Sequence, residues 1–155
     1  SSDVCSSDLN QQTFYYTNMQ PQYYNFNAGE NYEGIWVRME NWVRKKAQSL
    51  HDGDTLFVCK GGTIDNESQI LKRVKNQLIV PRYFYMALLM KSGGQYKAIG
   101  LWAEHKNTVD KSEVASHAIT IDELERLTGI DFFCNLPDDT ERKVQGSLSL
   151  ISWGL

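Results

Sequence analysis

Two apolar segments joined by a glycine turn constrain the fold of this chain more than any other feature. Residues 82–91 (RYFYMALLMK) and 96–104 (YKAIGLWAE) flank the tetrapeptide Ser92-Gly93-Gly94-Gln95. Paired glycines favour the tight turns that join antiparallel strands. The first segment is too apolar for an exposed edge strand, since edges are usually protected by charge or proline. The sequence therefore predicts a buried antiparallel hairpin inside a sheet.

Further strands and helices are predicted on both sides of this hairpin. Strands are expected at 13–17 and 55–60, the second ending at Gly61-Gly62. A helix is expected from Gly34, because apolar residues then recur at helical spacing; they are Ile35, Met39, Trp42, Val43 and Leu50. The capping box Thr120–Glu123 opens a helix that stops at Gly129, and Pro137 opens another. This order predicts an α+β fold with a mainly antiparallel central sheet and flanking helices.

The chain has 155 residues, enough for one domain with a sizeable core. Residues 1–9 (SSDVCSSDL) are small and polar, lack periodicity and resemble the translated end of a sequencing adapter. We expect them to be a non-native or disordered tail, and residues 10–155 to form the domain. No apolar run approaches the roughly 20 residues of a membrane span, and we recognise no signal peptide.

Charge is distributed unevenly along the sequence. The net charge is −3, which argues against a protein that coats nucleic acid through its overall field. Residues 38–46 carry four cations and one acid, and residues 71–82 carry four cations and no acid. Local basic patches on a mildly acidic body suit an enzyme that contacts a phosphate backbone and then releases it. Solvated charged faces are the alternative explanation.

Four stretches resemble the DNA/RNA non-specific endonucleases, the ββα-metal nucleases of the Serratia nuclease type. They are TFYYTNMQPQ at 13–22, GIWVRMENWVR at 34–44, LFVCKGGTI at 56–64 and ITIDELERLTGIDFFCNLPDD at 119–139. They resemble, in order, a strand before an Asn-x-x-Pro-Gln turn, a Gly-x-Trp-x-x-Leu-Glu helix, a strand ending in glycine and a closing signature around Leu-Pro-Asp-Asp. Each motif alone is weak evidence for the family. A chance match of all four motifs in the family's order is not a convincing explanation.

The resemblance implies a ββα-metal nuclease fold that is incomplete at its N-terminus. The family's Asp-Arg-Gly-His segment, whose histidine is the general base, is missing from this sequence. His51, His105 and His117 fall outside the matched motifs, and we expect them to be surface or supporting residues. The resemblance therefore implies a sequence-non-specific endonuclease for DNA and RNA, with little cleavage by this fragment. It also implies a secreted or periplasmic protein.

The resemblance further implies Mg²⁺, with Mn²⁺ as a second candidate, held by an asparagine at the start of the Trp36 helix. Mg²⁺ keeps most of its water and needs few protein ligands. Counting forward from Gln22 reaches Asn27, whereas counting back from Gly34 passes an insertion near GENYE and makes Asn31 the nearest amide. We favour Asn27 and keep Asn31 as the alternative. Without the resemblance, either asparagine is explained by turn formation alone.

The remaining site residues are also implied by the resemblance. Glu40 matches the helix glutamate that holds metal-bound water, and Arg44 matches the arginine that contacts the scissile phosphate. Arg38 and Lys45 add nucleic-acid contacts, and Asn18 supports the loop below the site. The alternative for Glu40 and Arg44 is a simple surface pair one helical turn apart. The contacts are expected at the backbone of DNA and RNA, without base preference and without a membrane.

Two other functions fit the same sequence. The chain could be a non-catalytic, nuclease-like module that binds nucleic acid or a protein partner. It could also be a structural α+β domain whose basic patches are only solvated surface. Addition of Mg²⁺ distinguishes the structural domain from a protein with a retained metal site, because Mg²⁺ stabilises only a protein that binds it.

Overall fold

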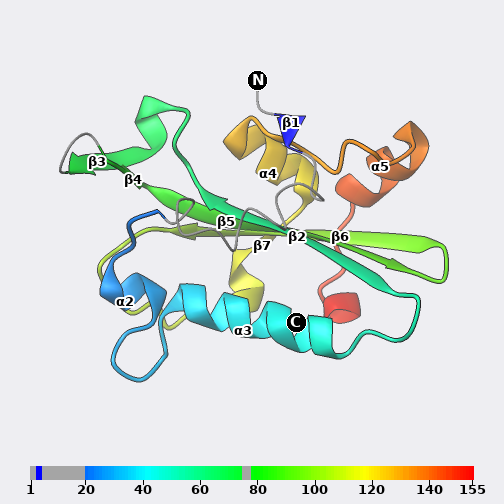
Figure 1. Ribbon diagram of the computed structural model, residues 1–155, viewed down its shortest axis with the longest axis horizontal. Coiled ribbons are helices and arrows are strands. Elements are labelled where there is room, and N and C mark those ends of the chain that lie inside the picture. The colour runs from blue at the N-terminus through cyan, green and yellow to red at the C-terminus, as the bar shows by residue number, and fades with distance from the viewer. Residues whose placement is uncertain (1–2, 5–19, 75–77) are drawn as a thin grey trace.

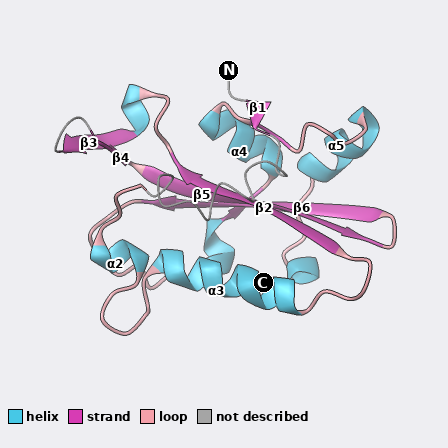
Figure 2. Ribbon diagram, in the orientation of Figure 1, coloured by secondary structure: helices cyan, strands magenta, loops and turns pink. Residues whose placement is uncertain are grey.

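The computed structural model describes residues 3–4, 20–74 and 78–155 of the chain. The strand expected at 13–17 and the supporting residue Asn18 lie outside this part. Within it, helices and strands form an α+β fold around an antiparallel sheet (Figures 1 and 2). The predicted fold class is confirmed. No helix among the described residues is long and apolar enough to cross a membrane.

The predicted hairpin lies at the centre of the main sheet. β5 (Tyr83–Ser92) pairs with β6 (Gln95–Glu104) from Ser92 and Gln95 at the turn to Tyr83 and Glu104. β2 (Thr55–Gly62) pairs with β5, and β7 (Ala118–Ile119) pairs with β6, so the order is β2-β5-β6-β7. Gly93 and Gly94 both adopt positive φ, which the tight turn requires.

The two faces of this sheet carry separate cores because side chains alternate along each strand. Phe84, Met86 and Leu88 face one core, whereas Tyr85, Ala87 and Leu89 face the other. The first face is covered by α2 (Tyr24–Asn27) and α3 (Ile35–Gln48). The opposite face is covered by α4 (Ile121–Thr128) and α5 (Asp138–Gln145), as Figure 1 shows.

Local signals in the second half of the chain predicted its helices correctly. The Thr120 hydroxyl accepts a hydrogen bond from the Glu123 N–H at 3.1 Å and caps α4. Gly129 ends α4 with a φ of 72°, and Pro137 caps α5. The last turn, η4 (Ile151–Trp153), buries Trp153 against the α3 face of the sheet.

Other elements differ from the sequence prediction. β2 continues through Gly61-Gly62, and a Cβ on Gly62 would lie 2.4 Å from Cγ of Pro81 and 2.5 Å from Oε1 of Gln20. The glycines thus belong to the strand and permit close packing at its end, which falls at Gly62. The basic segment 71–82 belongs largely to a separate antiparallel pair, β3 (Ile70–Val74) and β4 (Leu78–Pro81). Smaller elements complete the fold: β1 (Asp3–Val4), β8 (Asp131–Phe132), η2 (Glu67–Gln69) and η3 (Val114–His117).

Candidate functional site

The candidate site begins where α2 meets α3. Residues 24–27 form the short helix α2, although their asparagine-rich sequence favours a turn or loop. Phe26 drives this change, because its ring is buried and packs against Trp36 and Phe84 with centroid distances of 6.1 and 5.3 Å. Packing against the core therefore outweighs the low helix propensity of an asparagine-rich segment.

The insertion between α2 and α3 closes on itself. The Gly34 N–H donates to the Ala28 carbonyl oxygen at 2.8 Å. A Cβ on Gly34 would lie only 2.5 Å from the Asn27 carbonyl oxygen, so only glycine fits there. Residues 29–33 thus form an excursion whose two ends, Ala28 and Gly34, lie close together. With them set aside, the order is Asn27-Ala28-Gly34-Ile35-Trp36, which places Asn27 at the start of α3 and leaves Asn31 in the excursion.

A buried histidine fixes the start of α2. His105 is 2% exposed, and its Nε2 atom accepts a hydrogen bond from the Tyr23 N–H at 2.8 Å. Its Nδ1 atom therefore carries the proton and donates to the Pro81 carbonyl oxygen, also at 2.8 Å. Burial lowers the pKa of His105; the Pro81 contact opposes this, and the nearby charge of Lys72 adds to it. His105 is therefore a buried supporting residue and not a surface residue.

Glu40 and Arg44 lie on the same stripe of α3 but do not pair with each other. The Glu40 carboxylate accepts a hydrogen bond from Lys60 of β2 at 2.7 Å, and both side chains are about one third exposed. Arg44 is exposed and donates to Oδ1 of Asn41 at 2.6 Å. Lys60 was missed in the sequence, since nothing in the pattern of β2 indicates which helix residue it meets.

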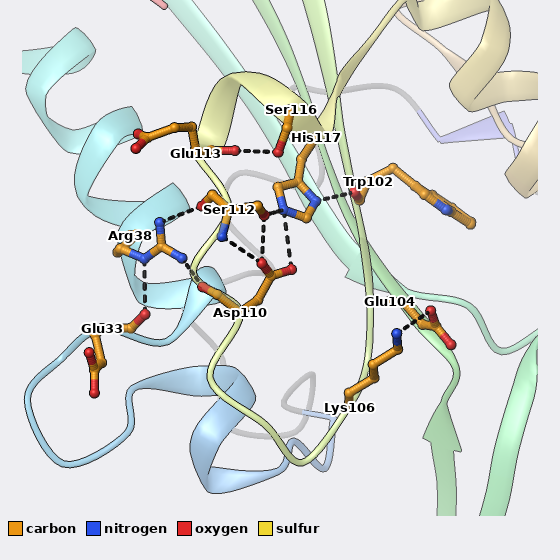
Figure 3. Close-up of polar contacts among 10 residues, drawn as sticks. All are labelled: Glu33, Arg38, Trp102, Glu104, Lys106, Asp110, Ser112, Glu113, Ser116 and His117. Atoms are coloured by element: carbon orange, nitrogen blue, oxygen red, sulfur yellow. Dashed lines mark hydrogen bonds and ion pairs between the residues drawn. The ribbon is translucent and has the colours of Figure 1, made fainter.

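Arg38 is engaged by backbone oxygens, as Figure 3 shows. Its Nε donates to the Glu33 carbonyl and one terminal nitrogen donates to the Ser112 carbonyl, each at 2.9 Å. The other terminal nitrogen donates to the Asp110 carbonyl. Arg38 therefore ties the insertion and the loop before η3 to α3. The predicted contact between Arg38 and nucleic acid stays a prediction. The Arg38 guanidinium already donates hydrogen bonds to three carbonyl oxygens of the protein.

The loop held by Arg38 is also braced by His117. Its Nδ1 lies 2.9 Å from the Trp102 carbonyl oxygen, and its Nε2 lies 2.8 Å from Oγ of Ser112 and 3.4 Å from the Asp110 carboxylate (Figure 3). Burial alone would raise the pKa of Asp110, but hydrogen bonds from Ser112 and the nearby charges hold it below its ordinary value. Both ring nitrogens of His117 are thus occupied by the fold.

Lys45 is exposed and lines an open groove between α3 and the C-terminal turn. The groove is lined by Arg38, Asn41, Trp42, Lys45, Glu113, Val114, Ala115, Gly154 and Leu155. By helical geometry, Lys45 projects about 100° around the axis from Arg44. The two predicted nucleic-acid contacts therefore lie on adjacent stripes of α3.

The described residues contain no group of three or more His, Cys, Asp or Glu side chains that could enclose a metal ion. Both candidate amides are exposed, Asn27 beside the start of α3 and Asn31 in the excursion before it. Glu40 follows six residues after Gly34, about 9 Å along the helix axis.

Comparison with known proteins is consistent with this geometry. A family model described as DNA/RNA non-specific endonuclease matches residues 1–139. The nuclease of Serratia marcescens is 21% identical over 131 residues, which cover 84% of this chain and 47% of that protein. Mitochondrial nuclease EXOG of Xenopus laevis is 26% identical over 145 residues, covering 86% of this chain and 38% of that protein. Nuclease C1 of Cunninghamella echinulata var. echinulata is 24% identical, covering 88% and 55%.

The fold has a match among solved structures. A crystal structure of the EndoG/EndoGI complex superposes with a TM-score of 0.62 at 19% identity, over 83% of this chain and 54% of that chain. The chain thus spans about half the length, or less, of the relatives that it matches.

Proposed function

This chain belongs to the DNA/RNA non-specific endonuclease family, and on that premise we propose that its site serves metal-dependent hydrolysis of phosphodiester bonds in DNA and RNA without base preference. One observation carries the proposal. The backbone of Ala28 and Asn27 lies against Gly34, at the start of the helix that bears Glu40 and Arg44, and this contact supports the choice of Asn27.

The residues at the start of α3 fit a hydrated Mg²⁺, with Mn²⁺ as a second candidate. Mg²⁺ is commonly held by one or two protein oxygens and several waters. Asn27 would supply the direct ligand, and Glu40 would orient water bound to the ion. Such an ion, when bound, stabilises the charge that develops on the phosphate and the leaving oxygen.

Arg44 is suited to the phosphate. Its guanidinium is exposed and donates a hydrogen bond to the neutral amide oxygen of Asn41, a contact that leaves its charge uncompensated. A planar guanidinium binds phosphate oxygens in pairs. Lys45 extends the same positive surface. Both contacts involve the backbone of the nucleic acid, which carries no sequence information.

We propose that this chain alone cleaves slowly, because none of its three histidines is placed to activate water. His105 and His117 have both ring nitrogens engaged by the protein. His51 follows the last turn of α3, some 20 Å from the start of that helix. Loss of a general base typically lowers the rate 10²–10⁴-fold. The same observation favours a second function, a non-catalytic module that binds nucleic acid.

Plasmid nicking and DNA binding test the two functions together. We expect slow nicking that requires Mg²⁺ and that added imidazole accelerates, because imidazole can replace a missing base. Binding to a duplex in Ca²⁺ should weaken in Arg44→Gln, whereas Lys91→Gln, which removes an exposed cation from the end of β5, should bind like the unaltered protein.

The results that contradict each function differ. Nicking as fast as that of the Serratia nuclease would disprove the proposed loss of the base. Binding without any nicking, unaffected by metal and by Arg44→Gln, would favour the non-catalytic module. No binding and no nicking under either condition would contradict both.

A further inference from the structure

Two tyrosines beside Asn27 are far more exposed than the other aromatic residues named in this fold. Tyr24 is 62% exposed and Tyr32 is 74% exposed, whereas Tyr85 is 7% exposed. Tyrosine rings normally bury most of their apolar surface. Two such rings within nine residues of sequence mark this surface as unusual.

Tyr24 lies close to the proposed metal ligand. It precedes Asn27 by three residues in α2, and residues at this spacing lie on the same side of a helix. Phe26 of the same helix points into the core. The side of α2 that carries Asn27 therefore also carries an exposed aromatic ring.

Tyr32 is held exposed by a strained backbone. Its φ is +56°, a conformation that bulky residues rarely adopt. The insertion that contains it is fixed at both ends, by the Ala28–Gly34 hydrogen bond and by Arg38 bound to the Glu33 carbonyl. Strain maintained by the surrounding structure is typical of ligand-binding segments.

Cations occur on the elements next to this segment. Nζ of Lys72 lies 5.0 Å from the ring centroid of Tyr23, the residue directly before Tyr24. Arg44 and Lys45 are exposed on the neighbouring helix. Exposed aromatic rings next to cations form the surfaces on which proteins bind single-stranded nucleic acid, with bases stacked on the rings and phosphates near the cations.

We propose that Tyr24 and Tyr32 form a stacking surface for an unpaired base next to the scissile phosphate, so that this site prefers single-stranded to double-stranded nucleic acid. The inference rests on the proposed function and adds a preference for strand state. It requires no base-edge contacts, because every base presents an aromatic face. Paired bases within a duplex are already stacked and cannot reach the rings.

Fluorescence anisotropy in EDTA, where cleavage cannot occur, tests this surface with three probes of equal length. They are a single-stranded DNA, the same strand with abasic linkers in place of its nucleosides, and a duplex. Tyr24→Ala and Tyr32→Gly should each weaken binding to the single strand by about 5- to 150-fold. Neither should alter binding to the abasic strand. Tyr24→Phe should bind as the unaltered protein does, because the ring is retained.

Two controls separate stacking from lost structure or charge. Ile151→Ala removes a 90% exposed apolar side chain in η4 and should leave binding unchanged. Tyr32→Gly should keep or raise the melting temperature, since glycine relieves a positive φ. The slope of log K against log salt should stay the same in both tyrosine variants, because phosphate contacts are unaltered.

Equal losses on the normal and abasic strands, or no loss on either, would overturn the stacking surface. If Arg44→Gln still weakens binding in that case, the proposed function stands and only the stacking surface fails. If the unaltered protein binds none of the three probes, in EDTA or in Ca²⁺, both fail.

Discussion

The Nε2 atom of His105 accepts a hydrogen bond from the backbone N–H of Tyr23 at 2.8 Å, across 82 residues of sequence. Through its other nitrogen the same ring binds the last residue of β4. It packs against Phe26 and Phe84 with centroid distances of 4.9 and 5.0 Å. The short helix that carries Asn27 is thus positioned by a neutral, buried imidazole.

Acid should therefore destabilise the protein through His105. Its pKa is lowered in the folded state, so its contribution to stability is complete above the unfolded pKa of about 6.5 and is lost as pH falls through the folded pKa. Urea unfolding between pH 7.5 and pH 5 should show this loss. His105→Gln should be less stable at pH 7.5 but less sensitive to acid. An unchanged dependence in His105→Gln would exclude this role.

Glu125 should reduce the stability of the protein at high pH, whereas His105 reduces it at low pH. Burial raises its pKa to about 7, despite a hydrogen bond from the Phe132 N–H, and Asp131 adds to the rise. A raised carboxyl pKa stabilises the fold at low pH, and this contribution is lost as pH rises from about 4.5 to 7. Glu125→Gln should raise the unfolding free energy at pH 8 by roughly 1 kcal/mol, a value reduced for partial exposure. Calorimetry at pH 8 and pH 4.5 checks this, and an equal effect at both values would refute it.

Lys60 should restrain metal binding through its contact with Glu40. Removing a cation next to the proposed ion should favour that ion, so Lys60→Met should lower the Kd for Mg²⁺ in a calorimetric titration. Stability should change by about 1 kcal/mol or less, because the pair is partly exposed. Lys91→Met, at the far end of β5, is the matched control. Weaker Mg²⁺ binding in Lys60→Met would mean that Lys60 supports the site and does not compete with it.

Substitutions of Arg38 and Arg44 should affect different properties, the first the stability of the fold and the second the binding of DNA. Arg38→Ala loses three hydrogen bonds to carbonyl oxygens and should reduce the unfolding free energy by about 2 kcal/mol. Arg44→Ala should change it by about 0.5 kcal/mol or less, as is usual for an exposed residue, but should weaken DNA binding. Urea unfolding and anisotropy on the same two variants decide between these roles. A stable Arg38→Ala with weakened binding would instead support the nucleic-acid contact predicted for Arg38.

Elements set by local chemistry could be predicted from the sequence. The Gly93-Gly94 turn and the Thr120 cap each need only adjacent residues, and both formed as expected. The helix beginning at Ile35 followed from apolar spacing alone. The family resemblance also came from the sequence alone, and the match over residues 1–139 confirms it.

Features that depend on distant contacts could not be predicted in this way. α2 forms because Phe26 is buried against residues of α3 and β5, although its own sequence disfavours a helix. The partner of Glu40 comes from β2, and the partner of Tyr23 comes from the end of β6. The sequence also contained no sign of where the insertion closes, which the Ala28–Gly34 contact shows, and the choice of Asn27 over Asn31 as metal ligand stays a prediction.

The central claim, that Asn27 holds a hydrated divalent ion, is tested most directly by melting temperature in MgCl₂ and in EDTA. At ten times its Kd, Mg²⁺ should stabilise the fold by about 1.4 kcal/mol, a rise of about 3–6 °C for a domain of this size. The unaltered protein and Asn31→Ala should show this rise, and Asn27→Ala should show none. A rise retained in Asn27→Ala, or absent from the unaltered protein, would contradict the account.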